Sequence, residues 1–137
     1  MRLCTGKLES VADKLLYARL SAGIHQDVLA SMVGIHRATL LRYENGRVAE
    51  ENMAADRLVQ IALVCGMDKY FCCSPYHVFI VEGAGQQIKQ YRKAMGLTQK
   101  RLASILGVTD AVVKRWEQNK NKPPVYVWEL ANGFRAD

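Results

Sequence analysis

The sequence contains no long hydrophobic run. None of its apolar stretches approaches the roughly 18–20 residues that a membrane-spanning helix needs. Its first residues, Met1–Lys7, lead into a charged segment instead of the apolar stretch of a signal peptide. We therefore expect a cytoplasmic protein with no membrane segment.

The cysteines form no C-x-x-C pair, which is the spacing that zinc sites usually show. The four cysteines are Cys4, Cys65, Cys72 and Cys73. Cys65 and one of the adjacent pair could hold a metal together with His77, and thiol or metal sensing stays open on that ground. The spacing favours buried thiols in a reducing cytosol instead. We expect no metal and no other cofactor.

Motifs for catalysis are also missing. The three histidines are scattered, and there is no Ser-His-acid set, no glycine-rich phosphate loop and no paired-carboxylate setting. We therefore expect the protein not to be an enzyme. What the chain does have is a hydrophobic fraction of 50% over 137 residues, which is enough to pack one ordinary domain or two very small ones.

Acidic residues are scarce in the second part of the chain. Residues 1–80 hold nine Lys and Arg against eight Asp and Glu, whereas residues 81–137 hold ten against five. Most of the net charge of +6 therefore belongs to the C-terminal part. A basic segment suits a polyanionic partner, although a solvated surface explains such an excess about as often.

The chain contains an internal repeat. Residues 22–46 align without a gap to residues 95–119 at an offset of 73, and nine of the 25 aligned positions are identical. The identical pairs are Gly23/Gly96, Gln26/Gln99, Leu29/Leu102, Ala30/Ala103, Ser31/Ser104, Gly34/Gly107, Ala38/Ala111, Arg42/Arg115 and Glu44/Glu117. Upstream, Leu15/Ile88 and Arg19/Arg92 fall in the same register. Chance does not explain so many matches, and we expect two copies of one structural unit.

Each copy begins with a short predicted helix, over Gln26–Val33 in the first copy and Gln99–Leu106 in the second. Apolar residues recur there at helical spacing. They are Leu29, Met32 and Val33, and then Leu102, Ile105 and Leu106. Thr98 has a hydroxyl that can cap the second of these helices, whereas His25 is a weaker occupant of the same position.

A glycine turn and a second helix follow in each copy. Gly34 and Gly107 stand where a helix end needs a left-handed residue. The next helix is predicted to start near His36 or Thr109. One such pair of helices would be weak evidence, because glycine turns between helices are common. Two copies with the same spacing, each followed by an aromatic-Glu pair, indicate a helix-turn-helix unit.

These segments resemble the lambda-repressor/Cro (XRE-like) helix-turn-helix family. The resemblance rests on Gln26–Ala30 and Arg42–Gly46 in the first copy, and on Gly96–Val108 and Arg115–Glu117 in the second. It covers roughly residues 10–73 and 84–134. The fold it implies is all-α, with two tandem bundles of five and then four helices joined by a short apolar linker. We expect the first domain at 1–74, the linker at 75–84 and a truncated second domain at 85–137.

The resemblance also implies which residues contact double-stranded DNA. The family's glutamine at the start of the second helix binds a phosphate and braces the recognition helix, a role that falls on Gln26 and Gln99. Exposed residues of the third helix read base edges in the major groove, and the following loop meets the backbone. In the first copy these are His36, Arg37, Ala38, Leu41, Arg42, Asn45, Gly46 and Arg47. In the second they are Thr109, Asp110, Ala111, Lys114, Arg115, Asn119, Lys120, Asn121 and Lys122. The core-facing residues of the same helices are expected to be Leu40, Tyr43, Val113 and Trp116.

The remaining elements are expected to differ between the copies. The first copy is predicted to continue with helices over Asn52–Cys65 and Asp68–Cys73. The second has one helix after a proline pair, over Val125–Asn132, which stops at Gly133. Between the copies, Tyr76–Val81 is apolar and β-branched, which favours a short strand. We interpret this segment as a packed connector or, alternatively, as an edge used for dimerisation.

These features predict a sequence-specific DNA-binding transcriptional regulator that acts as a repressor through both units. The alternative is that one unit binds DNA while the other serves dimerisation or partner binding, as in an antitoxin. Two residues keep the alternative open. Leu41 is apolar at a groove-facing position, and Asp110 repels phosphates, although it can accept from cytosine N4. The predicted partners are double-stranded DNA and, in a homodimer, a second copy of the chain.

Overall fold

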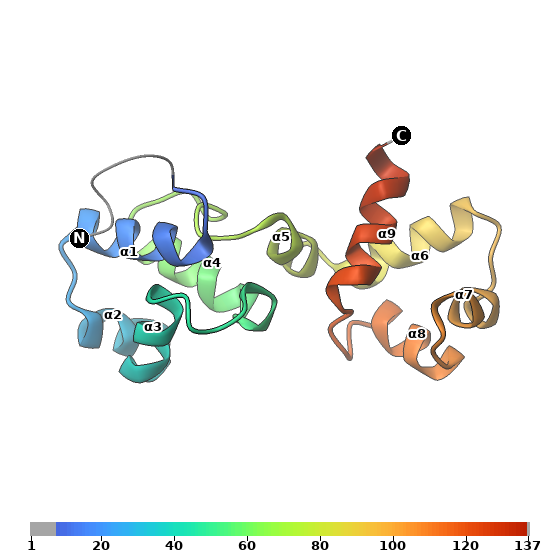
Figure 1. The fold of residues 1–137 in the computed structure, drawn as a ribbon, viewed down its shortest axis with the longest axis horizontal. Coiled ribbons are helices and arrows are strands. Elements are labelled where there is room, and N and C mark those ends of the chain that lie inside the picture. Colours follow the sequence, from blue (N-terminus) through green and yellow to red (C-terminus); the bar gives the residue numbers. More distant parts are fainter. Residues whose placement is uncertain (1–7, 137) are drawn as a thin grey trace. The chain divides into compact units, whose positions relative to one another are not determined.

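The computed structural model describes residues 8–136 and their side chains through Asn132. Within this range the chain forms helices α1 to α9 and one 3-10 turn, and it contains no strand (Figure 1). The predicted all-α class with tandem bundles is therefore confirmed. No helix among these residues is long and apolar enough to cross a membrane. The expectation drawn from Met1–Lys7, and Cys4 with it, lies outside the described residues.

The contacts within the chain divide it into two compact units, which we call unit 1 (through Val78) and unit 2 (from Phe79). Unit 1 contains α1 (Val11–Ala22), α2 (Gln26–Val33), α3 (Arg37–Glu44), the 3-10 turn η1 (Glu50–Asn52) and α4 (Ala55–Val64). Unit 2 contains α6 (Ala84–Ala94), α7 (Gln99–Leu106), α8 (Asp110–Glu117) and α9 (Val125–Ala136). The division between the units falls inside α5 (Pro75–Val81).

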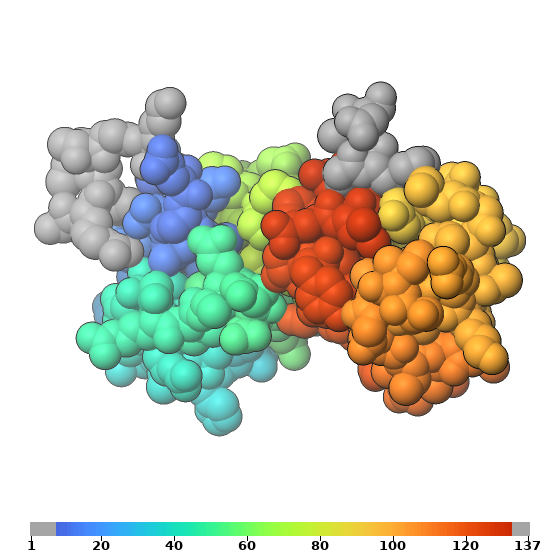
Figure 2. Space-filling view, turned by 45° about the vertical axis from the view of Figure 1, so that its right-hand side comes forward, coloured from blue at the N-terminus to red at the C-terminus, as the bar shows by residue number. Residues whose placement is uncertain are grey.

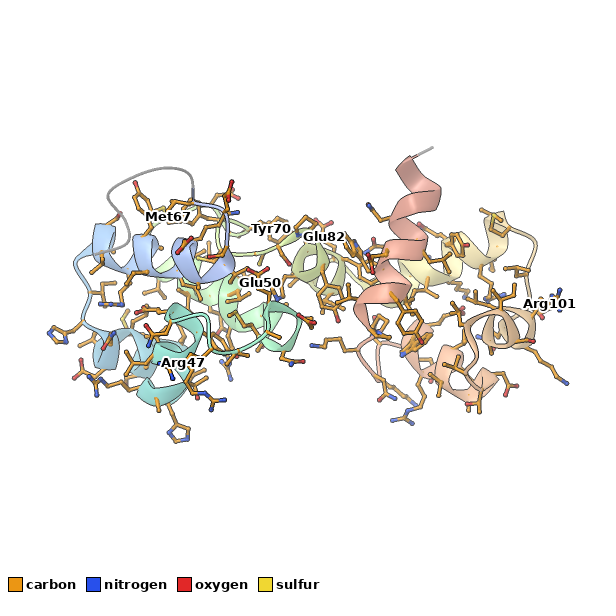
Figure 3. The ribbon with its side chains drawn as sticks, viewed as in Figure 1. Arg47, Glu50, Met67, Tyr70, Glu82 and Arg101 are labelled. Carbon is orange, nitrogen blue, oxygen red and sulfur yellow. The ribbon has the colours of Figure 1, made fainter. Side chains whose placement is uncertain are left out.

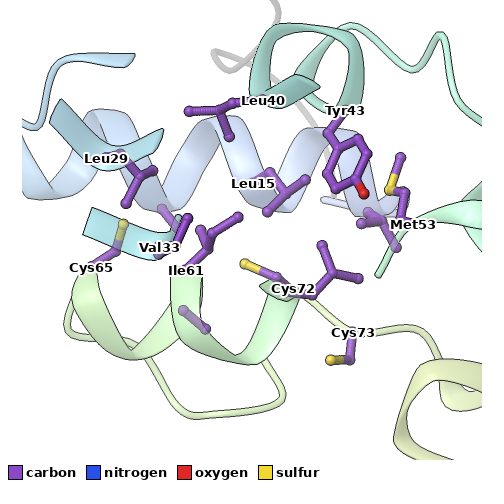
Figure 4. Packing of buried hydrophobic residues seen from close by; sticks show 14 of the residues in the cluster. Leu15, Leu29, Val33, Leu40, Tyr43, Met53, Ile61, Cys65, Cys72 and Cys73 are labelled. Atoms are coloured by element: carbon purple, nitrogen blue, oxygen red, sulfur yellow. The ribbon is translucent and has the colours of Figure 1, made fainter. Parts of the chain in front are cut away.

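The core of unit 1 lies between its first four helices. Leu15, Leu29 and Leu40 are fully buried, and Figure 4 shows them with Ile61 of α4. The principal contacts join α3 to α1 and α2, and α4 to the same two helices. Fully burying one aliphatic side chain is worth roughly 1.5–3 kcal/mol, so this cluster fixes where α3 sits on the unit.

Unit 2 repeats this arrangement with a different fourth helix. Ile88, Leu102 and Val113 occupy the positions of the three leucines, and α8 packs on α6 and α7. The principal contact of α9 is with α6, and Val127 of α9 is buried. The third-helix residues predicted to face the core are buried in both units, as expected. They are Leu40, Tyr43, Val113 and Trp116.

Two residues of the apolar pattern lie outside the core. Met32 is 59% exposed and Ile105 is 56% exposed, although they occupy the spacing of the buried leucines. The reason is the direction of the buried face of each helix. The small residues Ala30 and Ala103 are buried beside Leu29 and Leu102, which turns the opposite flank of the helix toward solvent.

The expectation of a strand over Tyr76–Val81 is wrong, because α5 occupies this segment. Two reciprocal hydrogen bonds between Ser74 and His77 cap the start of α5. Ser74 Oγ accepts from the His77 N–H at 3.4 Å, and the Ser74 N–H donates to His77 Nδ1 at 3.1 Å. Pro75 takes the first helical position, which its fixed φ favours. His77 is 1% exposed, and its Nε2 lies 2.7 Å from the carbonyl oxygen of Glu50. These cap contacts outweigh the β propensity of the apolar residues that follow.

Three helix boundaries also differ from the prediction. The short fifth helix expected over Asp68–Cys73 is a pair of turns with hydrogen bonds three residues apart, and α5 is the fifth helix instead. The fourth helix begins at Ala55 and not at Asn52, because η1 precedes it. In unit 2, α9 passes through Gly133 and continues to Ala136. A glycine inside a helix costs only about 1 kcal/mol, so it need not end the helix.

Candidate nucleic-acid interface

A left-handed glycine joins the second and third helices in each unit. Gly34 has a φ of 75° and Gly107 a φ of 74°, as the repeat predicts. The helix starts differ as predicted too. Thr98 Oγ1 accepts from the Arg101 N–H at 3.0 Å, whereas His25 makes no side-chain cap. Both units therefore have a tight helix-turn-helix, and its entry is better capped in unit 2.

The third helices, α3 and α8, bury one face and expose the other. The segments 37–44 and 110–117 lie at the molecular surface (cyan-green and orange in Figure 2). Every residue predicted to contact DNA is exposed or half-buried in the structure. The half-buried ones are Gln26, Leu41 and Gln99. Leu41 therefore meets solvent only in part, which fits an apolar residue at the edge of the exposed face.

A buried ion pair links the first and third helices of unit 1. Arg19 Nε donates to Glu44 Oε2 at 2.6 Å, and Nη2 of the same arginine donates to Oε1 at 3.1 Å. Arg19 Nη1 also donates to the carbonyl oxygen of Ile24 at 3.1 Å. Gln26 Nε2 donates to Glu44 Oε1 at 3.3 Å. A single carboxylate thus connects α1, the start of α2 and the end of α3.

Unit 2 contains the same network at the repeat positions. Arg92 donates to the two carboxylate oxygens of Glu117 at 2.7 and 3.1 Å, and to the Leu97 carbonyl oxygen at 2.9 Å. Gln99 Nε2 donates to Glu117 Oε1 at 3.0 Å. We call each set of three side chains an Arg–Glu–Gln triad. The triads are Arg19, Glu44 and Gln26 in unit 1, and Arg92, Glu117 and Gln99 in unit 2.

The contacts within the unit 2 triad shift the pKa values of its two charged members, Arg92 and Glu117. Burial by itself raises the pKa of Glu117. The hydrogen bonds from Arg92 and Gln99, with the positive charges of Arg92 and Lys89, outweigh that effect and lower the pKa below its ordinary value. The hydrogen bond to Glu117 raises the pKa of Arg92. Glu117 is therefore ionised at neutral pH and can only accept hydrogen bonds.

Charge near the start of the second helix differs between the units. The first turn of α2 contains Asp27, whose Oδ1 lies 3.3 Å from His25 Nδ1. The first turn of α7 contains the exposed cations Lys100 and Arg101, the latter labelled in Figure 3. Because a helix N-terminus already favours anions, the start of α7 attracts a phosphate more strongly than the start of α2.

The loops after α3 and α8 present the other predicted backbone contacts. Asn45 and Arg47 are exposed in unit 1, where Figure 3 labels Arg47. Lys120 and Lys122 are exposed in unit 2. The unit 2 loop is fixed by Asn119, which has a φ of 59° and whose Oδ1 accepts from the Gly85 N–H at 3.0 Å.

The arginines and glutamates of the triads align in the repeat, but the sequence alone predicts no role for them. Arg19 and Glu44 are 8% and 2% exposed, which is rare for charged residues unless they are paired. The signal was available in the repeat itself, because opposite charges stood at identical positions in both copies. What the sequence lacked was the proximity of α1 to α3, which only packing creates.

Three cysteines of unit 1 belong to its core. Cys65, Cys72 and Cys73 are buried free thiols. Burial raises the pKa of Cys72 to about 12 and that of Cys73 to about 11. Reactivity and metal binding both need the thiolate, and burial in apolar surroundings suppresses it. In the part of the chain that the structure describes, no three His, Cys, Asp or Glu side chains gather as metal ligands would.

Comparison with known proteins agrees with the repeat. The sequence model of a family described as "Helix-turn-helix" matches residues 15–69 and, separately, residues 88–134. The two matches cover most of unit 1 and most of unit 2. No curated protein and no solved structure matches the chain.

Proposed function

Since this chain belongs to the lambda-repressor/Cro (XRE-like) helix-turn-helix family in two tandem copies, we propose that it is a sequence-specific repressor of transcription that reads DNA through both units. The observation that carries the proposal is the duplicated triad beneath an exposed third helix. In each unit a hydrogen-bond network links the end of the third helix to the start of the second. Because the glutamine of each network stands at the start of the second helix, where a phosphate would bind, the duplication supports DNA binding by both units.

Base reading falls on the exposed faces of α3 and α8. Arg42 and Arg115 occupy the same repeat position and are exposed. An arginine fork donates two hydrogen bonds to guanine O6 and N7, which makes it the commonest specific base contact. The exposed Ala38 and Ala111 can accommodate a thymine methyl group. Because the other exposed positions differ between the helices, we expect an asymmetric site. Tethering the units raises the effective concentration of the second once the first has bound.

Loss of the two arginines tests this assignment. A DNA site is first selected from random duplexes with the wild-type chain. Arg42→Ala and Arg115→Ala should then each weaken binding to that site by about 1–3 kcal/mol in a gel-shift titration. Lys69→Ala and Lys93→Ala remove the same charge outside the proposed contact set and serve as controls. Normal specific binding by the Arg42→Ala, Arg115→Ala double variant would contradict the proposal.

The uneven charge supports a second candidate, in which unit 2 binds DNA and unit 1 serves dimerisation or partner binding in an antitoxin-like protein. Salt dependence separates the two. Each lysine or arginine that contacts a phosphate adds about 1 to the slope of log affinity against log salt. We expect both Arg47→Ala and Lys120→Ala to lower the slope. An unchanged slope for Arg47→Ala alone, together with a dimeric mass in sedimentation, would favour the second candidate.

A further inference from the structure

We infer that Glu44 and Glu117 are positioning residues for DNA binding, because each fixes the orientation of the glutamine amide that meets a phosphate. The inference rests on the proposed function, since it concerns how the same interface holds its phosphate contact. It assigns a binding role to two glutamates that themselves do not reach the DNA.

An ionised carboxylate can accept hydrogen bonds but cannot donate them. Glu117 Oε1 receives Gln99 Nε2 at 3.0 Å, so the NH₂ side of the amide faces the carboxylate. The reversed amide would bring Gln99 Oε1 against Glu117, and two acceptors repel. Glu117 therefore selects one of the two amide orientations. One N–H of the amide is used in this bond, and the second remains for an anion at the start of α7.

Arg92 makes this selection rigid. It contacts both carboxylate oxygens of Glu117 and also the carbonyl oxygen of Leu97, two residues before Gln99. The same guanidinium therefore fixes the carboxylate and the backbone that leads into α7. Bidentate pairs of this kind have a defined geometry, unlike a single lysine contact. The side chain of Gln99 is therefore fixed by its hydrogen bond to Glu117, and its backbone is fixed by the bond from Arg92 to Leu97.

Unit 1 differs in one respect that sharpens the test. Arg37 Nη2 lies 3.5 Å from Gln26 Oε1, so the oxygen side of that amide also has a donor. At the equivalent position of unit 2 stands Asp110, which cannot donate when ionised. The orientation of Gln26 thus has two determinants, Glu44 and Arg37, whereas that of Gln99 depends on Glu117. Loss of the glutamate should therefore affect DNA binding more in unit 2.

A double-mutant cycle on the full chain tests the inference. The variants are Glu117→Gln, Gln99→Ala and their combination, and the probe is the duplex selected from random DNA. We expect Gln99→Ala to weaken binding about tenfold, in the range of one hydrogen bond to a charged group. Glu117→Gln should weaken it about fivefold in the wild-type background and cause no further loss in the Gln99→Ala background. The matched cycle of Glu44→Gln and Gln26→Ala should give a smaller coupling.

A merely structural role gives another pattern. In that case Glu117→Gln weakens binding equally in both backgrounds, or lowers stability without changing affinity, and either result overturns the inference. Folding is monitored by tryptophan fluorescence. If Glu117→Gln unfolds unit 2, the pair Arg92→Met with Glu117→Met replaces it. Apolar replacement of a buried ion pair commonly keeps stability, and the amide still loses its partner.

A second readout locates the phosphate. Neutral methylphosphonates are scanned singly along the duplex, and the position where neutralisation costs the wild type affinity but costs Gln99→Ala nothing marks the contact. Glu117→Gln should lose sensitivity at that same position. Retained sensitivity there refutes the inference even if affinity falls. A wild-type chain that selects no DNA site contradicts the proposed function instead, so the two failures are distinguishable.

Discussion

Unit 1 and unit 2 hold the same triad but support it with different contacts at the start of their first helix. In unit 1 the Val11 N–H donates to Glu50 Oε2 at 2.9 Å, and Ser10 caps α1. In unit 2 the Gly85 N–H donates to Asn119 Oδ1 at 3.0 Å. Gly83, at the start of α6, has no side chain to cap the helix. The triads are alike because their members stand at repeat positions. The supports differ because they come from residues outside the 25 aligned positions or at their edge.

The same comparison explains why unit 2 has a glycine where unit 1 has alanine. A Cβ on Gly85 would lie 2.5 Å from the Glu117 carbonyl oxygen and 2.6 Å from that of Trp116. Ala12, the unit 1 counterpart, has a side chain at this position and is buried. Helix α6 therefore approaches the end of α8 more closely than a side chain permits, which brings Gly85 within reach of Asn119. Equal sequence positions thus do not imply equal helix spacing.

The largest effect is expected from adding a side chain at Gly85, where α6 approaches α8 closely. Gly85→Ala should destabilise unit 2 by about 1–3 kcal/mol, because a backbone carbonyl must move to admit the methyl group. Tryptophan fluorescence in a denaturant titration reports unit 2 alone, since Trp116 and Trp128 both lie there. The control Ala12→Gly changes unit 1 and should leave the fluorescence midpoint unchanged. Equal stability of Gly85→Ala and wild type would show that α6 can move away without cost.

A smaller effect is expected from exchanging the helix caps. Thr98→Ala removes the cap of α7 and should cost unit 2 about 1 kcal/mol. The reciprocal change, His25→Thr, supplies a hydroxyl where α2 has none and should stabilise unit 1 by about 0.5–1 kcal/mol. Hydrogen exchange of the first-turn amides of α2 and α7 measures both. If His25→Thr leaves exchange in α2 unchanged, a feature other than the cap limits the start of that helix.

Mild acid is expected to have the smallest effect. Because the pKa of Glu117 is lower in the folded unit than in the unfolded chain, its contribution is present above the unfolded pKa and is lost as pH falls through the folded one. The fluorescence midpoint of unit 2 should thus hardly change from about pH 7 to about pH 5 and fall below that range. In Glu117→Gln this acid-dependent loss should be reduced. An equally steep loss in that variant would assign the titration to another group.

The structural features that the sequence predicted correctly are those that depend on residues close together in the chain. Local sequence determines the bounds of α2 and α7, the glycines that end them and the buried face of the third helices. The same pattern occurs in both copies of the repeat, which strengthens each prediction. The prediction of a strand over Tyr76–Val81 was wrong because it considered only the apolar residues and not the helix-capping residues at the start of the segment. Ser74, Pro75 and His77 are these capping residues, although a histidine in place of Glu or Gln makes the capping box easy to overlook.

The sequence by itself determined the tandem helix-turn-helix pattern, because periodicity, caps and glycine turns act within a few residues. Only the tertiary structure decided what the charges shared by the two copies do. Arg19 and Glu44 are 25 residues apart, as are Arg92 and Glu117, and no local rule pairs them. The packing of α1 on α3 and of α6 on α8 removes these charges from water, and a buried charge must find its partner. That partner then holds the glutamine at the surface.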